Sequence, residues 1–273
     1  MITAAAVQMK LELTNTEKNL GTVASLATKA RESGAELIVF PECCLTGYAL
    51  TESEARSLAE PLPGPSTEKL AALCARIDAV IVIGLLESGD DGELYNTAAL
   101  IDPTGLRAGY RKTHLPTLGV DRFVTPGDKL TPPVDCKSGL AGLLICYDLR
   151  FPEPARVLAL EGAQMITLPT AWPRAASLYP DHIVRTRAAE NYIYVIAANR
   201  IGEERGTHYL GRSIIADPDG RILTEASSDD QEILIAQLDP ELTLDKHRIF
   251  QPGEYELDLL NDRRPDLYSA LSD

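Results

Sequence analysis

Cysteine is scarce and irregularly spaced in this chain. The five cysteines are Cys43, Cys44, Cys74, Cys136 and Cys146, an odd number with no Cys-x-x-Cys pair among them. A disulfide framework needs an even set, and zinc sites usually pair their ligands at short spacing. We therefore expect free thiols rather than disulfides or a zinc site. Because free thiols are typical of a reducing compartment, we expect a cytoplasmic protein.

Basic residues are also fewer than acidic residues in this chain. Lysine and arginine number 26 against 40 acidic residues, for a formal net charge of −14. Nucleic acids and anionic membranes favour basic surfaces, so neither is expected as a partner. The chain starts without a basic segment of the targeting type, and it lacks an apolar run long enough to span a bilayer. We expect neither a targeting segment nor a membrane span.

Several catalytic signatures are missing. The sequence has no Gly-x-Ser-x-Gly, no P-loop, no Gly-x-Gly-x-x-Gly after a strand and no His-Glu-x-x-His. Serine hydrolase, nucleotide-binding and zinc-protease functions therefore lack their signals. Only four histidines are present. A Cys–His pair forms in space rather than in sequence, so a Cys–His peptidase stays open as an alternative.

What is present is the pattern of an α/β protein. Apolar, strand-like runs alternate with helical periodicity, and the turns at 102–105 and 217–220 indicate hairpins. Hairpins among βαβ units predict mixed sheets, either two stacked sheets covered by helices or one large doubly wound sheet. The expected strands are 2–9, 36–40, 79–86, 96–101, 106–111, 139–145, 164–168, 192–198, 214–217 and 221–225, and the expected helices include 153–160 and 181–190.

Local signals refine this layout. A capping box of Thr14 and Glu17 predicts the start of the first helix, Gly34 its end, and Ser66 the cap of a second helix. No linker or repeat interrupts the chain, so we expect one domain over 1–273. The pattern becomes irregular after about residue 240, and 240–273 is predicted to be a tail lying over a surface, such as that of a partner subunit.

Three chemically active side chains follow expected strands. Glu42 comes after Leu37–Pro41, Lys112 after 106–111, and Cys146 after the apolar run that ends at Ile145. The carboxyl ends of strands are where α/β sheets usually build their sites. This shared position favours one site that contains all three residues.

Each of the three also has an ordinary interpretation. A strand-to-helix elbow at Cys146 would aim backbone N–H groups at a thiolate, but an isolated cysteine is usually core filling. A partly desolvated Glu42 could exchange protons near neutrality, or it could be a surface glutamate or a helix cap. The ammonium of Lys112 suits a developing oxyanion, or it is simply a solvated cation beside Arg111.

Longer motifs around these residues resemble a known family. The segments Phe40-Pro-Glu-Cys-Cys-Leu-Thr-Gly-Tyr48, Tyr110-Arg-Lys-Thr-His-Leu115 and Leu144-Ile-Cys-Tyr-Asp-Leu-Arg-Phe-Pro-Glu153 resemble the three signature blocks of the nitrilase superfamily of carbon–nitrogen hydrolases. Later stretches, Leu168–Trp172 and Ala198–Gly202 among them, also fit. The blocks occur in order and cover nearly the whole chain.

The resemblance implies an α-β-β-α sandwich of two mixed sheets that pairs into an α-β-β-α–α-β-β-α homodimer, or a higher homo-oligomer. It implies a Glu–Lys–Cys triad at Glu42, Lys112 and Cys146, with the Tyr147 backbone N–H helping to stabilise an oxyanion. It implies neither a metal nor a cofactor. The expected reaction is hydrolysis of a small amide to a carboxylic acid and ammonia through a cysteine thioester.

One departure from the family pattern concerns a second glutamate that many members carry between the lysine and the cysteine. Residues 113–145 of this chain contain no glutamate. Asp121, just before Arg122-Phe123, is the substitute candidate, and its ordinary interpretation is a turn aspartate.

The substrate is less well defined by sequence. Tyr147-Asp148 after the cysteine resembles amidases of the ω-amidase or aliphatic monoamide type more than nitrile-cleaving branches. Arg150 could bind a substrate carboxylate or form an ion pair with Glu153 or Glu190. Tyr48 and Trp172 are expected in the substrate pocket or in the core. An N-carbamoyl amide hydrolase, a nitrilase and a non-catalytic binding or scaffold relative remain alternatives.

Overall fold

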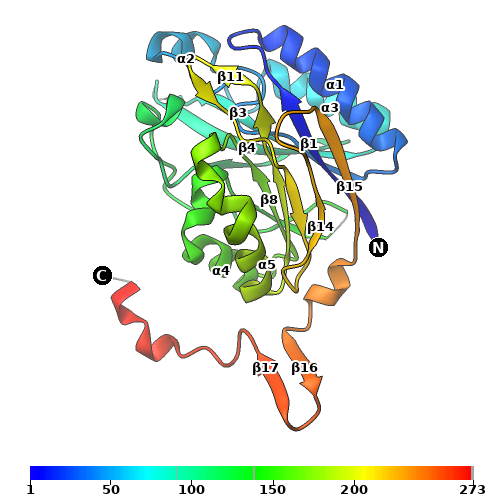
Figure 1. Ribbon diagram of the computed structural model, residues 1–273. Helices are drawn as coiled ribbons and strands as arrows, with labels where there is room; N and C mark the ends of the chain where they lie inside the picture. The colour runs from blue at the N-terminus through cyan, green and yellow to red at the C-terminus, as the bar shows by residue number, and fades with distance from the viewer. Residues whose placement is uncertain (91, 138, 272–273) are drawn as a thin grey trace.

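Two mixed β-sheets stack face to face in the computed structural model, which describes residues 1–90, 92–137 and 139–271 (Figure 1). The first sheet has the strand order β10-β1-β2-β3-β4-β5, with β15 also paired to β1. Its strands are β1 (Ile2–Lys10), β2 (Leu37–Val39), β3 (Val80–Ser88), β4 (Leu94–Asp102), β5 (Gly105–Arg111), β10 (Arg200–Ile201) and β15 (Glu232–Leu238).

The second sheet has the order β14-β13-β9-β8-β7-β6. Its strands are β6 (Val134–Asp135), β7 (Leu140–Leu143), β8 (Met165–Pro169), β9 (Tyr194–Ala198), β13 (Ile214–Ala216) and β14 (Ile222–Glu225). Parallel pairing joins β10-β1-β2-β3 in the first sheet and β7-β8-β9 in the second. Antiparallel partners complete the sheets: β15 on β1 and β4 on β3 in the first, β6 on β7 and β13 on β9 in the second. The predicted hairpins β4–β5 and β13–β14 are confirmed, and the two stacked sheets exclude a single doubly wound sheet.

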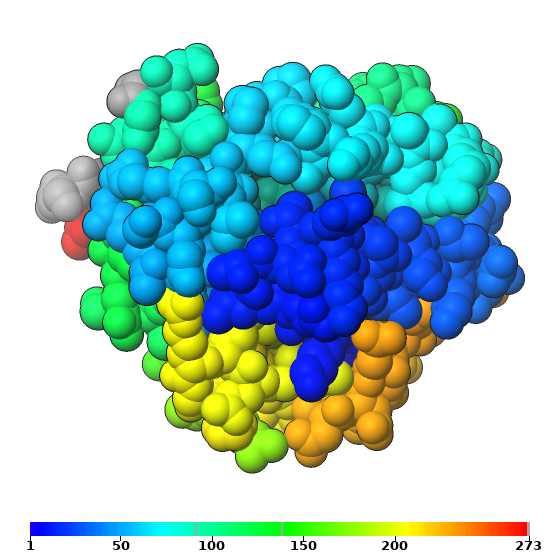
Figure 2. Space-filling view, turned by 90° about the horizontal axis from the view of Figure 1, so that it is seen from above, coloured from blue at the N-terminus to red at the C-terminus, as the bar shows by residue number. Residues whose placement is uncertain are grey.

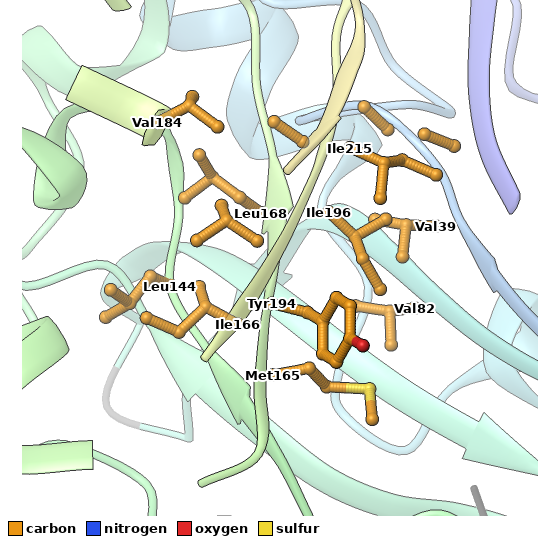
Figure 3. Packing of buried hydrophobic residues seen from close by; sticks show 14 of the residues in the cluster. Val39, Val82, Leu144, Met165, Ile166, Leu168, Val184, Tyr194, Ile196 and Ile215 are labelled. Carbon is orange, nitrogen blue, oxygen red and sulfur yellow. The ribbon is translucent and has the colours of Figure 1, made fainter. Parts of the chain in front are cut away.

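Alternation along β1 explains why the first sheet is apolar on both faces. Ala4 and Ala6 belong to the cluster of buried residues between the two sheets, whereas Ala5 and Val7 pack with the residues of the outer helices. Successive side chains of a strand point to opposite faces, so a continuous apolar run is what a strand covered on both sides requires. Figure 3 shows the inner layer, where Val39 of the first sheet lies beside Ile196 of the second.

Helices cover the outer faces. Helices α1 (Thr16–Glu32) and α3 (Pro65–Ile77) pack on the first sheet, and α4 (Pro152–Leu160) and α5 (Val184–Asn191) pack on the second (Figure 1). The short α2 (Glu52–Leu58) lies at one end of the sandwich. The expected α-β-β-α layering is therefore confirmed. Within the described ranges, no helix combines the length and apolar character needed to cross a bilayer.

Two helix starts differ from the sequence expectation. Asn15, not Thr14, caps α1, because its side chain accepts a hydrogen bond from the backbone N–H of Lys18. Helix α3 begins at Pro65 after Gly64, so Ser66 lies inside the first turn instead of capping it. Proline at the first helical position has a fixed φ that suits a helix start. Pro65 therefore sets the start of α3, and the capping preference of Ser66 does not.

The remaining short elements connect these layers or lie in the tail. They are the 3₁₀ turns η1 (Gly119–Arg122), η2 (Cys146–Arg150), η3 (Arg174–Ala176), η5 (Pro240–Thr243), η6 (Pro265–Leu267) and η7 (Ser269–Leu271), the π-helical turn η4 (Tyr179–Ile183), and strands β11 (Glu203–Glu204), β12 (Thr207–His208), β16 (His247–Gln251) and β17 (Tyr255–Asp258).

The tail after residue 240 is more regular than predicted. Strands β16 and β17 pair into an antiparallel hairpin that projects below the body of the molecule (Figure 1). Ile249 and Tyr255 on this hairpin and Leu267 and Leu271 beyond it expose more than half of their surface. A position at a subunit surface stays a prediction.

Candidate active site

Glu42 lies three residues beyond the end of β2, where the chain passes between the two sheets. Its backbone N–H donates to the carbonyl of Thr170, which follows β8, at 3.2 Å. Gly84 of β3 lets the Glu42 backbone pack close to that strand, because a Cβ atom at position 84 would lie 2.5 Å from the Cα of Glu42. The Glu42 side chain is fully buried. The carboxyl ends of strands from both sheets thus meet at this residue.

Lys112 reaches the same place from the end of β5. Its ammonium donates to Oε1 of Glu42 at 2.7 Å and to Oδ2 of Asp121 at 2.5 Å, and all three side chains are buried. An ion pair that is shielded from water on every side is held by strong, charge-assisted hydrogen bonds. The Lys112 cation is therefore fixed between two carboxylates. The sequence-predicted pair of Glu42 and Lys112 is in direct contact.

Asp121 lies in η1, in the loop after β5, and faces inward. Tyr48 donates its hydroxyl hydrogen to Oδ2 of Asp121 at 2.7 Å. The carbonyl of Tyr48 also accepts the N–H of Val120 at 3.0 Å. Tyr48 therefore forms hydrogen bonds to the Asp121 turn through both its side chain and its backbone. The substitute candidate for the missing glutamate contacts Lys112, and its catalytic role stays a prediction.

Sequence reasoning missed Asn96. Its side-chain amide donates to Glu42 at 2.7 Å and to Asp121 at 2.9 Å, so one neutral group ties together the two carboxylates that flank Lys112. Asn96 lies inside β4, a strand that is buried along its whole length. A lone amide within such a strand is the signal that could have revealed it, because buried polar groups need partners.

A second missed residue is Glu204, in β11. It accepts the backbone N–H groups of Tyr48 and Ala49, both at 3.0 Å, and the hydroxyl of Tyr209 at 3.0 Å. Its other oxygen lies 2.6 Å from the guanidinium of Arg200, and both side chains are buried. Glu204 thus anchors Tyr48, which in turn holds Asp121.

Cys146 opens η2 directly after the strand-like run through Ile145. Its φ of +47° is a left-handed conformation that non-glycine residues seldom adopt. Asp148 stabilises the elbow, since it accepts the N–H of Ile145 at 2.9 Å and the hydroxyl of Tyr110 at 3.0 Å. Such outliers gather at functional sites, and a tight elbow lifts a nucleophile away from its sheet.

Burial and charge set the protonation states of the three predicted triad residues. Burial raises the pKa of the Cys146 thiol well above its usual range, and the negative charge of Glu42 adds to this, while Lys112 opposes it. Burial also raises the pKa of Glu42, against the opposing effect of Lys112. For Lys112, burial disfavours the ammonium, but Asp121 and Glu42 outweigh it and the pKa is raised. The site therefore keeps a neutral thiol beside a charged lysine.

The loop after β8 closes the site from the second sheet. Asn199 accepts the backbone N–H of Trp172 at 2.8 Å and the hydroxyl of Thr170 at 2.9 Å. The backbone N–H of Ala171 interacts with the sulfur of Cys146 and favours its thiolate. Trp172 is almost wholly buried and stacks on Tyr179 at 5.1 Å. A pocket role for Trp172 is not tested by this packing.

The other predicted residues lie around the elbow. Arg150 is exposed and forms no ion pair within the described part of the chain. Glu190, one of its two expected partners, pairs with Arg187 at 3.1 Å instead. Tyr147 is half-buried, with its ring edge against Phe151. The carboxylate-binding role of Arg150 and the oxyanion role of the Tyr147 N–H stay predictions.

His114 packs beside the elbow at Cys146. The Nδ1 atom of His114 lies 2.8 Å from Asp148, and its ring stacks on Phe151 with centroids 4.1 Å apart. Both contacts brace the elbow from the side. Among the residues that the structure describes, no group of three or more histidine, cysteine or acidic side chains has the arrangement of a metal site.

Known proteins match the chain along most of its length. The carbon–nitrogen hydrolase family model matches residues 3–246. A hydrolase encoded in the pqqF 5′ region of Pseudomonas protegens is 38% identical, over 93% of this chain and 86% of its own. A nitrilase of Pyrococcus abyssi is 34% identical, over 98% of this chain and 99% of its own.

A solved structure agrees with these sequences. An amidase variant from Nesterenkonia sp. AN1, in which acrylamide has added to the active-site cysteine, superposes with a TM-score of 0.82. It is 25% identical, and the match covers 99% of this chain and 100% of that one. With the family match over 3–246 and the shared fold, the chain belongs to the carbon–nitrogen hydrolase family, within the nitrilase superfamily.

Proposed function

We propose that this enzyme hydrolyses a small amide to a carboxylic acid and ammonia, with Cys146 as nucleophile, Glu42 as general base and acid, and Lys112 as oxyanion stabiliser. One observation carries the proposal. Lys112 occupies one oxygen of Glu42, while the other, Oε2, is buried with no hydrogen-bond partner among the described residues. A buried carboxylate oxygen left open is costly unless a reactant uses it.

In the first half-reaction, Oε2 of Glu42 takes the thiol proton as the sulfur of Cys146 attacks the amide carbon. The C=O electron pair moves to oxygen, and Lys112 and the Tyr147 N–H stabilise that negative charge. Glu42 then gives its proton to the departing nitrogen, the carbon–nitrogen bond breaks, and ammonia leaves. A thioester remains on Cys146.

In the second half-reaction, the ionised Glu42 removes a proton from water. The resulting hydroxide equivalent adds to the thioester carbon, the carbon–sulfur bond breaks, and the proton returns to the sulfur of Cys146. The products are one carboxylic acid and a regenerated thiol. Every proton that moves starts and ends on Glu42, Cys146, water or the leaving group, so no cofactor is needed.

The test is ammonia release from a panel of short amides, dicarboxylic monoamides, carbamoyl amino acids and nitriles. We expect turnover of plain amides by the wild type, none by Cys146→Ala, and near-normal turnover by Cys74→Ala. Cys74 is a suitable control because it is a buried cysteine packed between α3 and the first sheet. Turnover that persists in Cys146→Ala would overturn the proposed nucleophile. If the wild type turns over no compound of the panel and forms no thioester detectable by mass spectrometry, the protein is instead a non-catalytic relative.

Two related chemistries are separated by the same panel. Carbon dioxide released from carbamoyl substrates without turnover of plain amides would indicate an N-carbamoyl amide hydrolase. Turnover confined to nitriles would indicate a nitrilase, the name carried by the relative from Pyrococcus abyssi. A Cys–His peptidase would instead lose its activity when one histidine is replaced. That alternative predicts that Lys112→Ala keeps its activity.

We also propose that the chain forms a homodimer, or a higher homo-oligomer, and that the tail contributes to the contact. The exposed apolar residues Ile249, Tyr255 and Leu267 of the tail and Leu160 of α4 support this, because such side chains are costly to leave in water together. Light scattering on the full chain should give at least twice the monomer mass of 29.6 kDa. A stable monomer at micromolar concentration would refute the pairing.

A further inference from the structure

A cavity lies against the turn that carries Asp121, and the charged residues in its lining are both positive. It has a volume of about 330 Å³, within the range of small-molecule pockets. Two arginines, Arg122 and Arg205, line it, and none of its described lining residues is aspartate or glutamate. The whole chain carries a net charge of −14, so a cavity whose charged lining residues are both cations stands out.

The two arginines differ in how much of their charge is available. Arg205 donates to Glu54 at 2.6 Å, which orients its guanidinium and partly neutralises it. Arg122 is exposed and has no hydrogen bond or ion pair from its side chain within the described ranges. Thr207 also lines the cavity. An anion entering here would meet the open guanidinium fork of Arg122, which matches a carboxylate bidentately.

The rest of the wall is suited to a carbon chain. Leu50, Leu118 and Phe123 line the same cavity. Apolar walls with a few placed polar groups are the usual composition of a small-ligand site. Figure 2 shows the two segments that bound the cavity on this face, near residue 50 in light blue and near residue 205 in yellow, lying side by side.

The cavity is also coupled to the candidate active site. Asp121 and Arg122 are consecutive in η1, with Asp121 turned inward to Lys112 and Arg122 lining the cavity. Tyr48 lines the cavity as well, and its hydroxyl binds Asp121. Its ring centroid lies 5.8 Å from the Lys112 ammonium. A ligand of Arg122 would therefore lie against the same short turn whose Asp121 contacts Lys112.

We propose that this cavity binds the carboxylate of a short aliphatic acid through Arg122, with Arg205 and Thr207 completing the site, and that occupancy acts on Asp121. The carboxylate has two sources with the same chemistry, the acidic tail of a substrate amide or a free acid such as the reaction product. The binding itself is independent of the amidase activity proposed above, whereas its kinetic effect rests on that activity.

Calorimetric titration with succinate tests binding directly. We expect Arg122→Gln to raise the Kd for succinate at least tenfold, and Arg76→Gln to leave it within twofold. Arg76 is a matched control because it is an exposed arginine on α3, a helix that contributes no residue to this cavity. Equal binding by all three proteins would overturn the proposal, as would an equal loss in both variants, which would indicate attraction by overall charge alone.

Kinetics then distinguish the two sources. If the substrate's tail binds, Arg122→Gln lowers kcat/KM for succinamate at least tenfold more than it lowers kcat/KM for butyramide, which has no carboxylate. If a free acid binds, succinate changes the turnover of butyramide at constant ionic strength, and Arg122→Gln abolishes that change. Loss of succinate binding in Arg122→Gln without either kinetic effect would overturn the coupling to Asp121. An enzyme inactive on every amide while succinate binding still depends on Arg122 would refute the proposed function and leave the site standing.

Discussion

Replacing Asp121 by asparagine removes one of the two carboxylates that hold the Lys112 ammonium. The side chain keeps its shape, so Tyr48 and Asn96 keep a neighbour, but the 2.5 Å contact with Lys112 loses its charge. A hydrogen bond to a charged group contributes about 1.5–3 kcal/mol. Because Lys112 retains Glu42 at 2.7 Å, we expect a loss of about 1.4–2.7 kcal/mol in transition-state stabilisation, or roughly 10- to 100-fold in kcat/KM.

The same substitution should shift the pH dependence. Burial is the main cause that raises the pKa of Glu42, and the negative charge of Asp121 adds to it, while Lys112 opposes both. In the proposed mechanism Glu42 must be ionised to accept the thiol proton, so kcat/KM is expected to rise as the pH rises through that pKa. Removing the charge of Asp121 lowers the pKa, and the rise should therefore move to lower pH in Asp121→Asn.

The assay is steady-state ammonia release from the best amide of the panel across the acidic range. Asp128→Asn is the matched control, because Asp128 is an exposed aspartate in the same loop. A kcat/KM within about threefold of wild type, roughly 0.7 kcal/mol, refutes a catalytic role for Asp121. A rise that moves to higher pH refutes the electrostatic argument even if the activity falls.

Three further substitutions test the supports of the site. Tyr48→Phe removes the hydroxyl that binds Asp121 and should lower kcat/KM about 5-fold, given roughly 1 kcal/mol for one hydrogen bond, without changing the unfolding midpoint in urea by much. Glu204→Gln leaves the buried Arg200 without its counter-charge and should cost about 3 kcal/mol in the free energy of unfolding, measured by urea denaturation. Gly84→Ala places a Cβ atom 2.5 Å from the backbone that carries the candidate base, so amide turnover should fall at least tenfold.

Periodicity and turn chemistry are local signals, and they predicted the local parts of this structure well. The hairpins at Asp102–Gly105 and Asp217–Gly220 occur as expected, because their turn residues favour one backbone course. The strand ends that carry Glu42 and Lys112 were equally visible. The elbow at Cys146 was expected from the switch between an apolar strand and a helix start, and its positive φ agrees with that expectation.

The supports of the site are long-range, and sequence reasoning did not find them. Asn96 is 54 positions from Glu42, and Glu204 is 156 positions from Tyr48, so no spacing rule connects either pair. Strand β15 was missed for a similar reason. It pairs antiparallel with β1 at the other end of the chain, and only the folded sheet brings them together. Partners of this kind are selected by tertiary packing rather than by local propensity.

Charge conservation explains why a thiol with a raised pKa suits this site. The Glu42 and Asp121 carboxyl groups already flank the Lys112 ammonium, and burial raises the pKa of the Cys146 thiol, so a resting thiolate would bring a further negative charge into a buried space. In the proposed attack, Glu42 becomes neutral as the oxyanion forms, so the net charge of the site does not change. It is unchanged again when Glu42 protonates the leaving nitrogen. Because the net charge of the buried site stays fixed, no step carries a large desolvation cost. A resting thiolate beside two carboxyl groups would carry such a cost.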